Sequence, residues 1–447
     1  MQKYLFKNIQ LVNEGKIQYV DLLTVNERIE KIDSGINVKG KVDEINGEHK
    51  YVFPGVIDDQ VHFREPGLTH KADIFSESRA AVAGGVTSFM EMPNTIPNTL
   101  TLQLLEEKYT IAAQTSLANY SFYMGVSNDN AEHVLQANTF KNEICGVKIF
   151  MGSSTGSMLV NNHATLNRIF SESEMLIATH CEDEMIIKRN YHTLKTAKKE
   201  LSPADHPLIR NEEACFESSL IAIQFAKKYN SRLHILHIST EKELQLFSNM
   251  LSLKDKMITA EVCVHHLHFT SADYATLGYL IKCNPAIKSH ENKTALWQAL
   301  LDDRLDVIAS DHAPHLLTEK DSPYEHAHAG MPLVQHPLLL MLHYYKQGYI
   351  SLEKIAEKMS HAVADCFMIK DRGYIREGYF ADLVLVDLNA NTKVEKNNLL
   401  YKCGWSPFEG FTFPATITNT LVNGNMVYDN GKIIESARGK RMSFNRK

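Results

Sequence analysis

Eight short apolar segments alternate with helix-like segments through the middle of the chain, and this alternation restricts the fold more than any other feature. It is typical of a repeated β/α unit, and eight such units predict a (β/α)₈ barrel of the TIM type. The predicted strands are Val52–Asp58, Val86–Met92, Tyr120–Val126, Gly146–Phe150, Met175–Thr179, Arg232–Ile238, Met257–Val262 and Asp306–Ser310. Helices are predicted between them, for example over Arg210–Lys228 and Asn292–Leu301, and the long fifth interval predicts an insertion around residues 186–209.

Both ends of the chain have a different pattern, in which short segments of alternating polarity are separated by turn residues. Tyr4–Ile9 and Gln18–Leu23 are examples near the start, and Ala381–Asp387 and Thr416–Gly424 near the end. Alternation of this kind predicts antiparallel strands. Neither end carries enough strands for its own core, so we expect both to pair into one small β-sandwich. The predicted domains are residues 1–53, the first part of the sandwich, 54–365, the barrel, and 366–447, the second part.

The composition is that of a soluble globular protein, with 44% hydrophobic and 22% charged residues among 447. A net charge of −6 gives no basic surface for nucleic acid. The longest apolar run, Pro337–Leu342, is too short to span a bilayer, and the first residues lack the apolar core of a signal peptide. Seven cysteines without Cys-x-x-Cys spacing predict free thiols in the cytoplasm.

Polar side chains gather where the predicted strands end, which is where barrel enzymes carry their active sites. After the first strand, Asp58, Gln60, His62 and Arg64 alternate along an extended segment and therefore point the same way. The other strand ends supply Asn94, Lys148, His180, His237, Asn284 and Asp311. Imidazole and carboxylate ligands together favour zinc or a similar divalent ion.

Six segments of the chain carry a resemblance to a known family. They are Val61-His-Phe-Arg-Glu-Pro-Gly67, Met92-Pro-Asn-Thr95, Gly146-Val-Lys-Ile-Phe150, Thr179-His-Cys-Glu-Asp183, His237-Ile-Ser-Thr240 and Ser310-Asp-His-Ala-Pro-His315. Together they resemble the dihydroorotases of the large bacterial class, in the amidohydrolase superfamily, over essentially the whole chain. Gln60 departs from the family pattern, which has a histidine at this position.

The resemblance implies a centre of one or two Zn²⁺ ions. Lys148 is carboxylated in the family, and its carbamate bridges the two metals. His62 and Asp311 would then hold one ion, and His180 and His237 the other. Gln60 would make the first position the weaker one, and could contribute an amide oxygen or hydrogen-bond a water. The alternative for Lys148 is an ion pair with Asp311 and no carbamate, since a buried ammonium needs a partner.

Arg64 is the predicted substrate anchor, because a guanidinium can bind a carboxylate through two hydrogen bonds. The alternative is a salt bridge to Glu65 or Asp73. The resemblance adds Asn94 and His315 as further contacts, Asn284 at the ring amide, and backbone groups near Ala329 and Gly330. Allantoinases usually lack the arginine and have Met-Pro-Leu-Asn where this chain has Met92–Thr95.

The expected activity is the reversible cyclisation of N-carbamoyl-L-aspartate to dihydroorotate in pyrimidine biosynthesis, with Asp311 as the catalytic proton carrier. Two alternatives stay open. One is another cyclic amidohydrolase, an allantoinase or hydantoinase. The other is a metal-poor homologue that serves as a structural partner of aspartate transcarbamoylase. The resemblance also suggests a homodimer.

Several further histidines have no predicted role as ligands. His265 and His266 match a family motif that supports the site, and with His268 they form a cluster after the seventh strand. His326, His328 and His336 are expected in a surface loop, as lid or solvent-facing residues. Cys181 is expected to point away from the site into the core.

Overall fold

The central sheet contains eight parallel strands that follow one another in chain order, from β6 to β13. They are β6 (Val56–Val61), β7 (Val86–Glu91), β8 (Asn119–Gly125), β9 (Gly146–Phe150), β10 (Ile177–His180), β11 (Leu233–Ile235), β12 (Ile258–Cys263) and β13 (Val307–Ala309). The first and last strands meet at their carboxyl ends, where the backbone N–H of His62 donates to the carbonyl of His312 over 2.7 Å. The predicted (β/α)₈ barrel is therefore confirmed in this computed structural model, which describes residues 2–152, 158–435 and 437–446.

The prediction of one strand over Val52–Asp58 is wrong, because this segment contains the end of one strand and the start of another. β5 (Lys50–Pro54) belongs to a second sheet, and β6 begins the barrel at Val56. The break falls at Gly55, where a Cβ would lie 2.1 Å from the hydroxyl oxygen of Thr87. Residues on both sides of the break are buried, so hydrophobicity alone does not reveal it.

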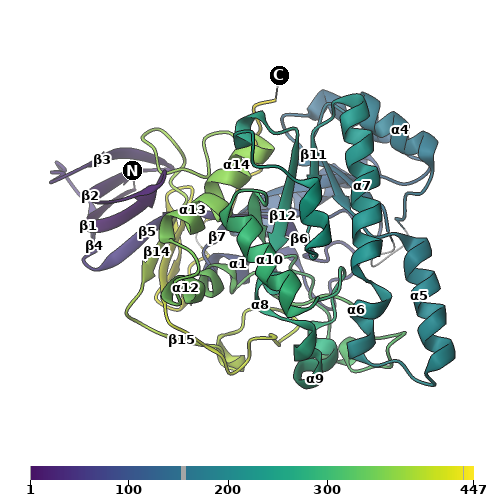
Figure 1. Cartoon of the computed structure of the whole chain (residues 1–447). Helices are drawn as coiled ribbons and strands as arrows, with labels where there is room; N and C mark the ends of the chain where they lie inside the picture. Colours follow the sequence, from purple (N-terminus) through teal and green to yellow (C-terminus); the bar gives the residue numbers. More distant parts are fainter. Residues whose placement is uncertain (1, 153–157, 436, 447) are drawn as a thin grey trace.

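Helices surround the barrel (Figure 1). Their bounds are α1 (Ile74–Ala83), α2 (Leu102–Thr115), α3 (Ala131–Gln136), α4 (His163–Glu172), α5 (Glu184–Ala197), α6 (His206–Ile209), α7 (Glu212–Tyr229), α8 (Val264–His268), α9 (Tyr274–Leu277), α10 (His290–Leu301), α11 (Leu317–Lys320), α12 (Pro337–Lys346), α13 (Leu352–Ala356) and α14 (Ala362–Phe367). The two helices predicted by name are α7 and α10. Helix α7 begins after Asn211, whose side chain caps the N–H of Ala214, and ends at the left-handed residue Asn230.

The predicted insertion is present between β10 and α7, where α5 and α6 project beside the barrel (Figure 1). No helix in the described ranges is long and apolar enough to cross a membrane.

Both ends of the chain build one nine-stranded sheet, in the order β19-β18-β17-β14-β5-β1-β2-β3 with β4 beside β1. Its strands are β1 (Lys3–Asn13), β2 (Lys16–Val25), β3 (Arg28–Asp33), β4 (Asp43–Asn46), β5, β14 (Leu383–Asp387), β17 (Thr416–Val422), β18 (Asn425–Asp429) and β19 (Lys432–Ile433). A separate pair is formed by β15 (Thr392–Lys393) and β16 (Thr412–Phe413). Figure 1 shows the purple first strands beside the yellow-green β14.

The join between the two ends is the antiparallel pair β5–β14, in which Val52 lies opposite Leu385. Ile29 of β3 and Met426 of β18 belong to the same hydrophobic core although their strands lie far apart in the sheet order. The sheet therefore curls around a shared core, as the predicted sandwich of both termini requires. Most pairs in this sheet are antiparallel, as predicted, and β1 pairs in parallel with β4 and β5.

Candidate metal centre and active site

The six predicted metal ligands lie around one small cavity at the carboxyl end of the barrel. Its lining is Gln60, His62, Lys148, Phe150, His180, His237, Asn284, Asp311, Ala313, Ala329 and Gly330. The ligands come from five strands, β6, β9, β10, β11 and β13, or from the residues just after them. His62 and Asp311 meet because the barrel closes between β6 and β13. The structure thus brings the whole predicted set together.

His180 and His237 form one half of this set. Nδ1 of His180 lies 3.0 Å from Nε2 of His237, and the two rings are almost perpendicular, at 80°. The other ring nitrogen of His237, Nδ1, has no hydrogen-bond partner in the described part of the chain. Burial lowers the pKa of both imidazoles, so both are neutral and able to offer a lone pair.

A buried carboxylate lies behind His180. Oε2 of Glu182 is 3.1 Å from Nε2 of His180, and Arg210 forms an ion pair with the same carboxylate. Burial raises the pKa of Glu182, but the Arg210 guanidinium and His180 lower it more, to about 2. Nε2 of His180 does not meet the geometry of a hydrogen bond to this carboxylate, so Glu182 acts on the ring through its charge, which makes an imidazole a stronger ligand for a metal.

His237 is held through its backbone by a second buried acid. Its N–H donates to Oε1 of Glu261 over 2.9 Å. Glu261 also faces His234, whose Nε2 lies 3.2 Å from Asp59 and 3.4 Å from Glu261. Burial lowers the pKa of His234, but its hydrogen bonds to the two acids raise it to about 9. This cation therefore lies beneath the site and joins β6, β11 and β12.

Lys148, the middle residue of β9, is 1% exposed. Its Nζ lies 4.6 Å from the centre of the Phe150 ring, and no hydrogen-bond or ion-pair partner exists for it among the described residues. The alternative ion pair with Asp311 is absent from the same residues. Burial lowers the pKa of Lys148 to about 7. The neutral amine is therefore populated at neutral pH, and this is the form that can react with CO₂.

His62, Gln60 and Asp311 form the other half of the set. Nε2 of His62 lies 3.2 Å from Oδ1 of Asp311, and Nε2 of Gln60 donates to the same oxygen over 3.1 Å. The amide oxygen of Gln60 instead faces the thiol of Cys263, at 3.8 Å. Gln60 thus presents its amide nitrogen to Asp311, and its role here is to orient that carboxylate.

Three residues of the site have left-handed backbone conformations. The φ angles are +67° at Arg64, +40° at His237 and +47° at Asp311. Such conformations cost free energy in residues with a Cβ and persist where the surroundings hold them. All three lie two or three residues after the end of a barrel strand. The left-handed conformation changes the direction of the chain there and turns these side chains toward the barrel mouth.

The donor set fits a divalent metal of the zinc type. Two neutral imidazole nitrogens point at each other across 3.0 Å, and a third imidazole and a carboxylate meet on the opposite side. Lys148 lines the same cavity and has no hydrogen-bond or ion-pair partner among the described residues. Imidazole nitrogen and carboxylate oxygen are the ligands of catalytic zinc sites.

A second cavity, of about 410 Å³, opens beside the first and is lined by the predicted substrate residues Arg64, Asn94 and His315. Arg64 is 3% exposed. It donates through Nε to the Pro314 carbonyl over 3.2 Å and lies 3.0 Å from Nε2 of His315 through Nη2. Burial lowers its pKa to about 10. The described residues offer this guanidinium no carboxylate within salt-bridge distance, so the predicted alternative partners, Glu65 and Asp73, do not pair with it.

Asn94 connects the two cavities, because its Oδ1 lies 2.8 Å from Nδ1 of His62. This contact orients a candidate metal ligand. On the far side of His315, Lys71 lies 3.2 Å from Nδ1 and donates to Glu319 over 2.5 Å. Among the described residues, Arg64 and Lys71 thus have one carboxylate, Glu319, within salt-bridge distance of either cation, and the cavity between them is suited to an anion.

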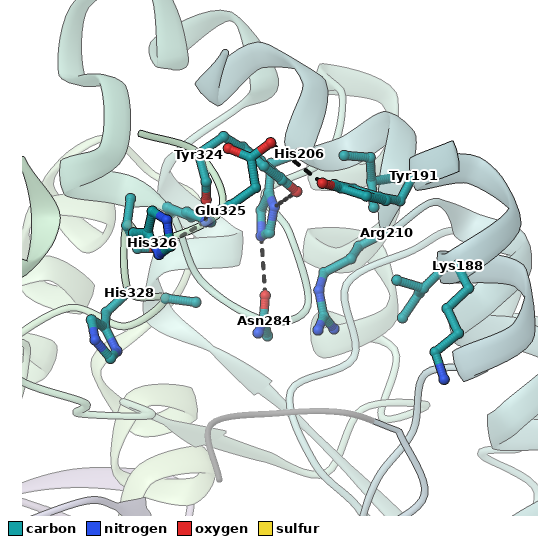
Figure 2. A pocket seen from close by; sticks show the side chains of 14 residues that line it. Lys188, Tyr191, His206, Arg210, Asn284, Tyr324, Glu325, His326 and His328 are labelled. Carbon is teal, nitrogen blue, oxygen red and sulfur yellow. Dashed lines mark hydrogen bonds between the residues drawn. The ribbon is translucent and has the colours of Figure 1, made fainter. Parts of the chain in front are cut away.

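Asn284 lines both the metal cavity and an open cavity of about 600 Å³. Figure 2 shows His206 between Tyr324 and Asn284. Nδ1 of His206 lies 2.8 Å from the Tyr324 hydroxyl, and Nε2 lies 3.0 Å from Oδ1 of Asn284. The imidazole thereby fixes the amide oxygen and leaves the amide nitrogen of Asn284 to face the centre.

Ala329 and Gly330 line the metal cavity as expected. Gly330 has a φ of +138°, and a Cβ there would lie 2.4 Å from the Ala313 carbonyl oxygen. Its own N–H donates to Lys282 and its carbonyl accepts from Lys320. Gly330 is therefore a packed backbone element of the wall.

The C-terminal part of the chain reaches this site directly. The indole N–H of Trp405 donates to the carbonyl of His315 over 2.7 Å. His336 also contacts this part, with its ring stacked on Phe413 and Nδ1 3.1 Å from the Tyr401 hydroxyl. The expectation of a lid or solvent-facing His336 is wrong, because these aromatic rings bury it. His326 is exposed and His328 half-buried, and Cys181 is buried as expected.

Sequence reasoning missed the residues that support the predicted ones. Glu182 lies two residues after His180 in a segment already recognised, so its position was a usable signal. Lys71, Arg210 and His206 lie in loops or in the insertion, where no pattern marks them.

Comparison with known proteins agrees with this geometry. The amidohydrolase family model matches residues 51–427. The chain belongs to the amidohydrolase family. A dihydroorotase from Halobacterium salinarum is 32% identical over 436 residues, which cover 96% of this chain and 97% of that protein. A dihydroorotase from Pyrococcus furiosus is 31% identical over 441 residues, covering 97% and 96%.

Relatives with other names are similar as well. An allantoinase from Desulfitobacterium hafniense is 30% identical over 407 residues and 89% of each chain. The solved structure of an L-hydantoinase from Arthrobacter aurescens superposes with a TM-score of 0.93, at 26% identity over 99% of this chain and 100% of that one. This amidohydrolase is therefore an enzyme that hydrolyses cyclic amides, and metal dependence is general in its family.

Proposed function

We propose that this amidohydrolase is a dihydroorotase, which interconverts N-carbamoyl-L-aspartate and dihydroorotate plus water in pyrimidine biosynthesis. The observation that carries the proposal is the guanidinium of Arg64, which is buried beside the candidate metal centre and without a carboxylate partner among the described residues. Dihydroorotate bears a carboxylate on its ring, whereas allantoin and simple hydantoins do not.

Charge supports this choice of substrate. A buried guanidinium is costly unless an anion compensates it. Among the described residues Glu319 is the one carboxylate within salt-bridge distance of either Arg64 or Lys71, and Asp311 and Glu91 act on Arg64 only from farther away. A substrate carboxylate would complete the set through two parallel hydrogen bonds to Arg64. With the carboxylate in this cavity, the ring would extend toward His62 and Asn284.

The reaction needs a water, a polarised carbonyl and a proton carrier. A divalent cation held by the proposed ligands supplies the Lewis acid and makes a water more acidic. Asp311 accepts the proton of the attacking water and delivers it to the departing ring nitrogen. Gln60 and His62 hold the Asp311 carboxylate in place. In the direction of synthesis the carbamoyl nitrogen attacks the side-chain carboxylate carbon, and Asp311 takes the proton from this nitrogen and gives it to the departing oxygen. The oxygen takes up one further proton from solvent and leaves as water.

Carboxylation of Lys148 completes the proposed centre. Its lowered pKa favours the neutral amine, and the carbamate would replace a buried cation by an anion with two ligand oxygens. Lys148→Ala should lose both metal and activity. Short carboxylic acids should partly restore activity by standing in for the carbamate, and failure of every such acid to restore either property would count against a bridging carbamate.

We also propose Zn²⁺ as the native ion, a homodimer, a cytoplasmic location and possible association with aspartate transcarbamoylase. Elemental analysis of the purified protein tests the metal. Light scattering, alone and with the transcarbamoylase added, tests the assembly.

The function is tested by a substrate panel. Purified protein is assayed with dihydroorotate, N-carbamoyl-L-aspartate, allantoin, hydantoin and dihydrouracil, the last of which has the dihydroorotate ring without its carboxylate. A kcat/KM for dihydroorotate that exceeds that for dihydrouracil by several orders of magnitude is expected. A higher kcat/KM for allantoin or hydantoin would contradict the proposal and would identify the enzyme as an allantoinase or a hydantoinase.

A further inference from the structure

A cluster of three potential metal ligands lies beside the candidate centre but is separate from it. His265 and His266 belong to α8, which follows β12, and Cys283 precedes Asn284 in the chain. One ligand atom from each of the three lies within 4.8 Å of the other two. All three side chains are buried, with exposed fractions of 1%, 3% and 1%.

The histidines of this cluster leave nitrogens unsatisfied. In the described part of the chain, both ring nitrogens of His265 and Nδ1 of His266 have no hydrogen-bond partner of normal geometry, although the backbone of Ser310 lies near His265. Buried polar atoms almost always have a partner, and an unsatisfied one costs free energy. A neutral imidazole has one N–H and one nitrogen with a lone pair, so His265 and His266 each offer one lone pair here, and two lone pairs at one place fit a group that accepts them.

His266 has the arrangement of an imidazole that is ready to bind a metal. Its Nε2 lies 3.1 Å from the carbonyl of Pro285 and donates to it. This bond places the proton on Nε2 and leaves a lone pair on Nδ1, as the outer hydrogen bonds of metal-bound histidines do. The thiol of Cys283 donates to the same carbonyl over 3.2 Å.

We propose that His265, His266 and Cys283 bind a zinc-type divalent cation that is distinct from the centre around Lys148. Two imidazole nitrogens and one thiolate are ligands that zinc prefers, and the sulfur excludes hard cations such as Mg²⁺ and Ca²⁺. Burial raises the pKa of Cys283, so the thiol keeps its proton in the absence of metal. The ion takes the place of this proton, which is released to solvent on binding.

The other acid- and histidine-containing cluster, Asp59, His234 and Glu261, does not need an ion. His234 already lies within 3.4 Å of both carboxylates and is their cation. Of these two clusters of described residues, the cluster around Cys283 is therefore the one whose imidazole nitrogens lack hydrogen-bond partners.

An ion bound to Cys283 would also affect the active site, because the next residue in the chain belongs to it. Asn284 lines the metal cavity and is attached directly to Cys283, while His265 and His266 are fixed in α8. An ion here would anchor the loop that carries Asn284 to the end of β12. It would be a structural ion, whose presence does not depend on which cyclic amide the enzyme hydrolyses.

Cobalt substitution of the full-length protein tests the proposal. A cobalt–thiolate bond gives a charge-transfer band in the near ultraviolet, and the centre at Lys148 has no proposed sulfur ligand. We expect the band in the wild type, its loss in Cys283→Ser, and the loss of one metal equivalent in the same variant. Cys263→Ser and Cys181→Ser are the controls, because these thiols lie beside Gln60 and His180. Both should keep the band, as should Lys148→Ala.

X-ray absorption of the native zinc protein gives a measurement that needs no variant of the cluster. One sulfur neighbour at about 2.3 Å from part of the zinc is expected, also in Cys263→Ser and Cys181→Ser. A spectrum with only nitrogen and oxygen neighbours, with the metal sites filled, would overturn the proposal. A thiolate band that survives in Cys283→Ser, or disappears in Cys263→Ser, would overturn it equally.

Discussion

Gln60 on the first barrel strand donates its amide N–H to the carboxylate of Asp311, 3.1 Å away and 251 residues later in the chain. The bond crosses the seam where β6 meets β13. The dihydroorotase pattern that the sequence resembles has an imidazole at this position, and here the side chain offers a hydrogen-bond donor instead. The metal position shared by His62 and Asp311 consequently has one nitrogen ligand fewer.

Replacing Gln60 by histidine should raise the metal affinity of the proposed position at His62 and Asp311 and leave the affinity of the other position unchanged. Gln60→His adds an imidazole beside Asp311, which zinc prefers to an amide. Titration with a chelator should remove one metal equivalent before the other in the wild type, and Gln60→His should delay the first loss without changing the second. Two ions of equal affinity in the wild type, unchanged in the variant, would contradict the role given to Gln60.

Removing the Arg64 guanidinium should affect only substrates with a carboxylate. Arg64→Ala should lower kcat/KM for dihydroorotate by roughly 30- to 1,000-fold, since loss of one partner of a buried charge pair costs about 2–4 kcal/mol. The rate with dihydrouracil is the internal control and should change little. Equal losses with both substrates would mean that Arg64 supports the fold of the site.

Lys148 should make the stability of the metal-free protein depend on pH. Burial lowers its pKa to about 7 from an ordinary value of 10.5. Between these values the unfolded chain holds a proton that the folded chain lacks, so the free energy of unfolding rises with pH. In CO₂-free buffer, metal-free Lys148→Met should be more stable than metal-free wild type at about pH 6, and the difference should shrink toward about pH 10. Urea unfolding across this range measures it, and a difference independent of pH would refute the lowered pKa.

Asp311→Asn should separate proton transfer from metal binding. The amide cannot accept the proton of the attacking water, so turnover should fall by several orders of magnitude even in protein that retains metal. Metal content and activity are measured on the same preparation. Activity near that of the wild type would place the proton carrier elsewhere.

Glu182 should act through His180. Glu182→Gln removes the negative charge behind that ring and leaves Arg210 without its ion-pair partner in the site. The affinity for the ion at His180 and His237 should fall by about 10- to 100-fold, as loss of an outer carboxylate usually causes. Competition with a zinc indicator measures it. Glu325→Gln is the matched control, because that exposed acid pairs with Lys195 on the surface and its loss should leave metal affinity unchanged.

The barrel could be predicted because its strands are buried on both faces and therefore form continuous apolar runs. The site residues could be predicted because each is a polar residue within or shortly after such a run, and a closed barrel brings the carboxyl ends of all strands together. The same continuity hid the break at Gly55, where two buried strands of different sheets are joined.

Other features depend on contacts that no local pattern contains. His336 is buried by aromatic residues that come more than sixty positions later, so its own surroundings in the sequence suggested a surface loop. Lys71 and His206 act through His315 and Asn284, and only the folded chain shows these pairings. The orientation of the Gln60 amide is likewise set by its neighbours Asp311 and Cys263.

The pairing of β5 with β14 also constrains the order in which the protein can be completed during synthesis. Strands β1 to β5 leave the ribosome first, but β5 gains its partner only when β14 has been made, after the entire barrel. Domains generally fold as units while the chain is extended. The barrel must therefore close while the edge of β5 still lacks β14, and this exposed edge is where a nascent chain of this protein is most open to chaperones and to aggregation.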